Sequence, residues 1–238
     1  MPSLNGTAAS RGTLPERVRL LPLPLWAVIG LIGFSASIAQ IVLMRELMVV
    51  FYGNEISLGV MLAAWLLWTA LGSNFLGKLT VHTHAADRLI AALQLLVALV
   101  FPATILLIRL SRQAFHAIPG ELLGPIPMLT TCVLALSCFC LVSGCLFTAG
   151  SQFYARGVMD SNFTATSSVY LLEACGSAAG GILASLVLIR YLTSIQAGLL
   201  VSLLNLLAAA HLAIRRVSYR RISTVPRSSA LPQIVMGQ

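Results

Sequence analysis

Six long apolar runs dominate the chain, and short polar connections separate them. The runs cover residues 23–44, 56–76, 89–108, 126–150, 168–189 and 195–214. Each has about 20 mainly apolar residues, the length that an α-helix needs to cross the hydrocarbon core of a bilayer. The pattern predicts an all-α polytopic membrane protein, a bundle of about six transmembrane helices.

The runs also predict the domain organisation. We expect a cytoplasmic N-terminal segment at 1–22, a six-helix transmembrane domain at 23–214 and a basic cytoplasmic tail at 215–238. A signal peptide would also combine N-terminal arginines with an apolar run. The first run is longer than the 7–15 residues typical of a signal peptide, and no small-x-small cleavage site follows it. We therefore interpret it as a retained helix.

Composition excludes an ordinary soluble domain and bears on orientation. The chain is 58% hydrophobic and 9% charged, whereas soluble domains carry roughly 25% charged residues. The net charge is +8, but the basic residues lie between and after the apolar runs, so we expect no nucleic-acid partner. Eleven of the 15 Lys and Arg residues fall on the side of the two termini. The positive-inside rule then places both termini in the cytoplasm.

A basic cluster begins the predicted C-terminal tail. It comprises Arg215, Arg216, Arg220 and Arg221. These side chains are expected to contact anionic lipid headgroups, each contributing about 1 kcal/mol. The alternative is that the cluster acts only as a topology signal.

Small residues predict where helices pack closely, because close backbone approach drives helix association in lipid. Gly30 and Gly33 begin a stripe along the first run, and Gly176 and Gly180 lie four residues apart in the fifth. We expect these glycines at helix–helix contacts. The second run has further small residues near one face: Gly59, Ala63, Ala70 and Ser73.

Glu173 is an ionisable residue inside the fifth run. A charge at the centre of a membrane helix costs ~2.5–3.5 kcal/mol on insertion scales, and such residues usually face the bundle interior. Glu173 shares a helix face with Gly176 and Gly180, so we expect it to point into the bundle. It is either a proton or cation site, or a structural carboxyl that is hydrogen-bonded or remains wet near the interface.

A second polar group lies around the end of the first run. It contains Gln40, Arg45, Glu46 and Asn54. Together with Glu173, these residues are our candidates for a ligand-binding pocket within the bundle. The alternative is that Arg45 and Glu46 form an interfacial charge pair that ends the helix.

Metal, cofactor and catalytic motifs are not evident in the sequence. The five cysteines all lie in apolar segments and form no C-x-x-C pair, so we expect neither a disulfide framework nor a zinc site. No Ser-His-Asp, Cys-His or paired-carboxylate arrangement can be assembled with any specificity. We predict no cofactor, no metal and no catalytic residue.

Two segments carry a family resemblance. The first is Gly33-Phe-Ser-Ala-Ser-Ile-Ala-Gln-Ile-Val-Leu-Met-Arg-Glu-Leu47, followed by Gly53-Asn-Glu55 and Trp65-Leu-Leu-Trp-Thr-Ala-Leu-Gly-Ser73. The second is Tyr170-Leu-Leu-Glu-Ala-Cys-Gly-Ser-Ala-Ala-Gly-Gly181. With these motifs the chain resembles the membrane-integral region of bacterial membrane-bound spermidine synthase-like (polyamine aminopropyltransferase-like) proteins.

The resemblance implies a bacterial inner-membrane location and a link to polyamines. Members of that family usually carry a soluble aminopropyltransferase domain after the helices, but the 24 residues after Ile214 have no strand pattern and no Gly-rich turn. We therefore expect a non-catalytic membrane subunit that anchors a partner or binds a small ligand. The alternatives are a transporter or half-transporter for a small cationic solute such as a polyamine, and a membrane component of an aminopropyltransferase completed by another chain.

The expected partners follow from these hypotheses. They are the lipid bilayer, a soluble or membrane protein, and a second copy of the chain in a homo-oligomer.

Overall fold

The structure, a computed structural model, describes residues 25–52, 55–76, 86–115, 124–157 and 162–223. These ranges contain six helices that are long and apolar enough to cross a membrane, and they contain no strand. The prediction of an all-α polytopic bundle is therefore confirmed.

Two of the six spans contain a π-helical segment, η2 at the end of the second and η3 near the end of the fifth. The elements are α1 (Leu25–Val50), α2 (Glu55–Leu71) with η2 (Gly72–Leu76), α4 (Ala86–Ala114), α5 (Pro125–Gly157), α6 (Asn162–Leu183) with η3 (Ala184–Leu188) and α7 (Ile189–Tyr191), and α8 (Ser194–Ser223).

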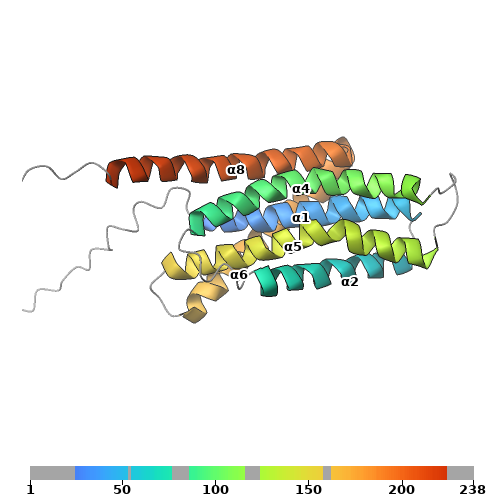
Figure 1. The fold of residues 1–238 in the computed structure, drawn as a ribbon, viewed down its shortest axis with the longest axis horizontal. Helices are drawn as coiled ribbons and strands as arrows, with labels where there is room; N and C mark the ends of the chain where they lie inside the picture. The colour runs from blue at the N-terminus through green and yellow to red at the C-terminus, as the bar shows by residue number, and fades with distance from the viewer. Residues whose placement is uncertain (1–24, 53–54, 77–85, 116–123, 158–161, 224–238) are drawn as a thin grey trace, which may run out of the picture.

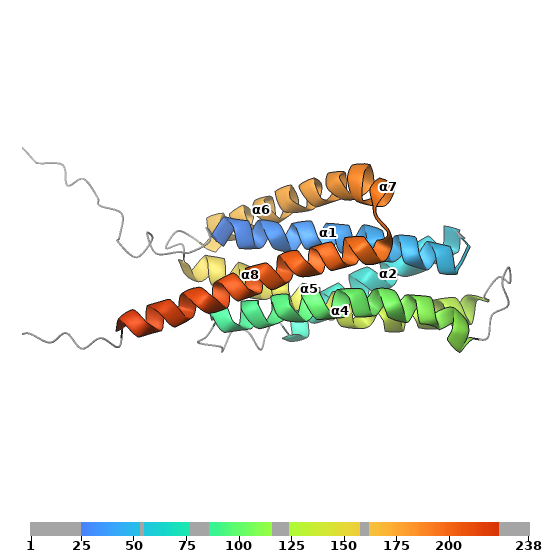
Figure 2. The ribbon, with the colours of Figure 1, turned by 90° about the horizontal axis from the view of Figure 1, so that it is seen from above.

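Helix α1 is the centre of the bundle. It contacts α2, α4, α5, α6 and α8, and Figure 2 shows α6 on one side of it and α8 crossing it. Successive spans run in alternating directions, so α1, α4 and α6 begin at the bundle end where α8 finishes (Figure 1). Only 17% of the residues in the α6 span are buried, compared with 50% for α1. Helix α6 therefore lies at the periphery of the bundle.

Aromatic rings fill the space among α2, α4 and α5. The Phe139 ring lies 5.3 Å from that of Phe101 and 5.7 Å from that of Trp65, measured between centroids. Both phenylalanines are essentially inaccessible to solvent. These tilted pairs have the geometry that aromatic rings favour, and they fix the spacing of the three helices.

A glycine seam joins α1 to α6; the small-residue stripes predicted that these glycines lie at helix contacts, but not which helices would meet. A Cβ atom on Gly33 would overlap the backbone oxygen of Glu173, and one on Gly176 would overlap the backbone oxygen of Gly30. A Cβ on Gly180 would collide with the backbone oxygen of Phe34. The two backbones are thus in direct contact, as in other small-xxx-small pairs. Gly30 itself has more room, since its Cβ would lie 3.9 Å from the nearest atom.

The packing face of the second span differs from our prediction. Gly59, Ala63 and Ala70 are exposed, and a Cβ on Gly59 would meet nothing within 4 Å. The close contact lies at the other end of the span, where Gly72 meets the backbone of Leu141.

Helix α5 supplies the other half of this contact. Gly144 meets the backbone oxygen of Thr69, and the hydroxyls of Ser73 and Thr148 are hydrogen-bonded at 2.7 Å. Ser73, the last member of the expected stripe, lies in this seam, whereas Gly72 and Gly144 were not among the expected packing residues.

Candidate functional site

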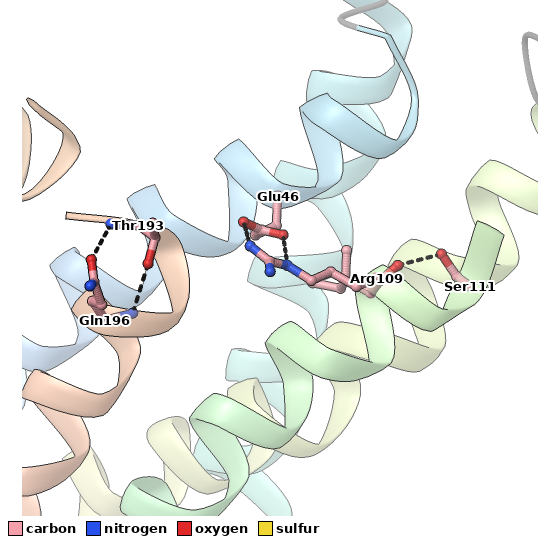
Figure 3. Close-up of polar contacts among 6 residues, drawn as sticks. Glu46, Arg109, Ser111, Thr193 and Gln196 are labelled. Atoms are coloured by element: carbon pink, nitrogen blue, oxygen red, sulfur yellow. Dashed lines mark hydrogen bonds and ion pairs between the residues drawn. The ribbon is translucent and has the colours of Figure 1, made fainter. Parts of the chain in front are cut away.

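Glu46 forms an ion pair with Arg109 between α1 and α4. Arg109 donates from Nε to Oε2 of Glu46 at 2.8 Å and from one terminal nitrogen to Oε1 at 2.9 Å (Figure 3). This two-point geometry is the strong form of an arginine–carboxylate contact. The Glu46 side chain is 9% exposed and that of Arg109 is 44% exposed, so the carboxylate depends on its partner more than the guanidinium does.

Arg45 points to a different helix from its neighbour. Its guanidinium donates to the backbone oxygen of Ile189 at 3.3 Å, which joins α1 to the segment that follows α6. Arg45 and Glu46 therefore do not end the first helix. The predicted end near Met44 was wrong, and α1 continues to Val50, because neighbouring helices satisfy both charged groups.

The turn into α8 lies beside this ion pair. Gln196 accepts a hydrogen bond at Oε1 from the backbone nitrogen of Thr193 at 2.9 Å, and Thr193 Oγ1 accepts one from the backbone nitrogen of Gln196 at 3.3 Å. This reciprocal pair is a capping box, which satisfies backbone groups that a helix start leaves open.

Glu173 lies in the glycine seam, on the face that the sequence predicted. Its side chain is half-buried, and Oε1 accepts a hydrogen bond from the Ser177 hydroxyl at 3.4 Å. Its own backbone oxygen meets Gly33 of α1. A carboxyl group here faces the helix contact, which is compatible with either a structural or an ion-binding role.

Two of the five pocket candidates, Glu46 and Glu173, lie far apart along the bundle. Glu173 lies level with Gly33, which is thirteen residues from Glu46 on α1; at 1.5 Å per residue this separates the two carboxyls by roughly 20 Å along the bundle. Gln40 lies between them and is half-buried. Asn54 is outside the described residues. Ligand binding by any of the five stays a prediction.

The basic cluster lies at the far end of α8. The backbone of this helix is described to Ser223, and it places Arg215, Arg216, Arg220 and Arg221 on the last turns. Their side chains are outside the described part of the structure, so contact with lipid headgroups also stays a prediction. Figure 1 shows that this end of α8 lies at the same end of the bundle as the start of α4.

Sequence reasoning missed Arg109. From the sequence, Arg109 is assigned to the loop after the third apolar run, because it directly follows Ile108, where that run ends. A signal for the pair was nevertheless available. Both Glu46 and Arg109 were expected at the same membrane face, and opposite charges at equal depth on different spans commonly pair.

Buried amides were also missed. Asn205 and Gln94 are both 0% exposed, and each lies within an apolar run. The Asn205 side-chain nitrogen donates to Ser35 Oγ at 2.8 Å, which connects α8 to α1. Isolated polar residues inside a predicted span are the signal that could have identified them.

Comparison with other proteins identifies no relative. No family model, curated protein or solved structure matches the chain. The arguments on function therefore depend on the residues of this chain.

Proposed function

We propose that this chain is a non-catalytic integral membrane subunit that anchors a partner protein at the bacterial inner membrane. It would be a counterpart of the membrane half of spermidine synthase-like proteins. The resemblance of residues 33–47 and 170–181 to that family suggests the polyamine connection. The observation that carries the structural role is the Glu46–Arg109 ion pair.

The ion pair supports a scaffold because it uses the polar residues of the family-like motif for helix packing. Both oxygens of Glu46 accept from Arg109, and Arg45 binds a backbone oxygen. Groups engaged in this way hold α1, α4 and the end of α6 together. The same motif residues would have to break these contacts in order to hold a substrate.

The orientation of the bundle is part of the proposal. Both termini lie in the cytoplasm, so the basic end of α8 faces anionic lipid and a cytoplasmic partner. Fusions of a periplasm-active phosphatase after Ser223 and after Phe115 test this orientation. The proposal requires activity only for the fusion after Phe115, and the reverse result overturns the orientation.

Co-purification of aminopropyl transfer is the direct test of function. The tagged chain is purified from gently solubilised membranes and assayed with putrescine and decarboxylated S-adenosylmethionine. A scaffold predicts activity that co-purifies with the chain and falls at least about tenfold when Arg215, Arg216, Arg220 and Arg221 are changed to Gln, whereas Gln113→Leu retains it. Absence of transfer from the native complex removes the polyamine connection.

The half-buried Glu173 carboxyl favours one alternative, a transporter for a small cationic solute. This function predicts uptake of labelled spermidine into proteoliposomes that collapses in Glu173→Gln and persists in Ser177→Ala. The third hypothesis, an enzyme completed by another chain, predicts that the purified partner transfers aminopropyl groups only after this chain is added back. A scaffold predicts a partner that is active alone.

A further inference from the structure

Uncharged polar side chains are buried on the three mutually contacting helices α1, α4 and α8. The members, named here the amide cluster, are Ser35, Gln94, Ser202 and Asn205, with exposed fractions of 3%, 0%, 8% and 0%. Figure 2 shows α8 crossing over α1 and running along α4, and contacts join each pair of these helices.

The helix register places Gln94 and Asn205 at similar heights on two packed helices. Helices α4 and α8 are antiparallel, and Gly198 of α8 lies against Ile105 of α4. Counting from that contact, Gln94 and Asn205 differ in height by four residues, about 6 Å along the axes. Ser202 is three residues from Asn205 and shares its face. Ser35 is already hydrogen-bonded to Asn205 at 2.8 Å.

Most polar atoms of the cluster have no hydrogen-bond partner among the described residues. These are Nε2 and Oε1 of Gln94, Oγ of Ser202 and Oδ1 of Asn205. The exceptions are the Asn205 nitrogen, which also donates to the Val201 backbone oxygen at 2.9 Å, and Ser35 Oγ, which accepts from that nitrogen. Burying an amide without a partner is costly, and lipid offers no replacement. The unpaired atoms of Gln94 and Asn205 differ in height by about 6 Å, whereas Ser202 is about 10 Å from the level of Gln94. The two amides therefore indicate that another molecule satisfies them.

We infer that the amide cluster binds a small neutral molecule that both donates and accepts hydrogen bonds, the smallest being water. The cluster offers acceptors on Gln94 and Asn205 and a donor on Gln94, with no charged member. The Glu46–Arg109 pair is eleven residues away along α1, about 16 Å. A buried water needs two to four polar partners, and the cluster supplies that number. This inference rests on the bundle and is independent of the scaffold function.

Hydroxyl-radical footprinting with synchrotron X-rays tests the inference in the intact protein. The beam converts bound water to radicals that modify adjacent side chains. Val97 and Phe101 follow Gln94 by three and seven residues on the same helix. We expect these two residues to be modified more than Met61. Met61 is 0% exposed and is intrinsically more reactive, so it is a stringent dry control. Modification at or below the Met61 level overturns the inference of bound water.

A Gln94→Leu variant tests whether the Gln94 amide is hydrogen-bonded to a bound molecule or has no hydrogen-bond partner. If a bound molecule satisfies Gln94, the variant loses hydrogen bonds and its apparent Tm falls by about 2–4 °C. If the amide is orphaned, its removal raises the Tm, which overturns the inference. Gln113→Leu, at an exposed position of the same helix, should change neither Tm nor footprint. If Gln94→Leu does not fold, the wild-type footprint alone tests the inference of bound water.

The source of the bound molecule is resolved by analysing the purified protein. Denatured wild-type and Gln94→Leu samples are extracted and compared by mass spectrometry. A neutral solute present in wild type near one per chain and lost in the variant identifies a small-molecule ligand, which supports the inference even where no water is labelled. Footprinting without such a solute identifies water. A wild-type sample with neither signal overturns the inference.

Discussion

Arg109 on α4 donates two hydrogen bonds to the carboxylate of Glu46 on α1, although the two residues are 63 positions apart in the sequence. Arg45, which is next to Glu46, instead donates to the backbone oxygen of Ile189. Neighbouring residues on a helix point about 100° apart. Arg45 therefore could not share the direction of Glu46, and the carboxylate finds its partner on a different helix.

Removal of the Arg109 guanidinium should destabilise the bundle. Arg109→Met leaves a 9%-exposed carboxylate without its two-point partner, and we expect a loss of about 1–3 kcal/mol. For a chain of this size that lowers the apparent Tm by roughly 2–4 °C per kcal/mol. The measurement is thermal unfolding in detergent, followed by the loss of the monodisperse peak on size exclusion.

Arg45→Met is the matched control. It removes an arginine at the same bundle end, but one that is exposed and makes one hydrogen bond, at 3.3 Å, within the described residues. The Tm of this variant should therefore change by less than half as much. The double variant Glu46→Arg, Arg109→Glu should recover part of the stability. Equal effects of Arg109→Met and Arg45→Met would contradict the importance of the pair.

Alanine at Gly33 should separate α1 from α6. The added Cβ overlaps the Glu173 backbone oxygen, which no rotamer change can relieve, and overpacking of this kind costs about 1–3 kcal/mol. Gly30→Ala, one turn away, meets its nearest atom at 3.9 Å and should be neutral or slightly stabilising, since alanine is the better helix former. A distance measurement between spin labels on α1 and α6 would reveal the separation. Equal behaviour of the two variants would count against the seam.

The α2–α5 contact yields an independent comparison. Gly144→Ala places a Cβ on the Thr69 backbone oxygen, whereas Gly59→Ala enters open space. We expect a Tm decrease only for Gly144→Ala, because only there must two backbones move apart. The pair also discriminates between the observed seam and the face that the small-residue pattern of the second span predicted, for which Gly59 would be the sensitive position.

The six spans could be predicted from sequence because the bilayer imposes a length and an apolar composition on each helix. Glu173 and the glycine seam followed from spacing within single helices. The partner of Glu46 did not follow, since pairing across helices depends on rotation and register that periodicity does not reveal. The end of α1 at Val50 was missed for the same reason. Gly144 was missed because its contacts, Thr69 and Ser73, are on another helix.

Cysteine accessibility tests the packing of α5 and α6. Cys138 and Cys175 are exposed on the bundle surface, whereas Cys132, Cys140 and Cys145 are buried. Because a thiol must be reached in order to react, a detergent-soluble maleimide should modify the first two at least about tenfold faster than the other three. Intact-mass spectrometry should show two adducts on the folded protein and five after denaturation in SDS. Modification of Cys140 together with Cys138 would place both faces of α5 toward the surface, which is incompatible with its packing against α2 and α4.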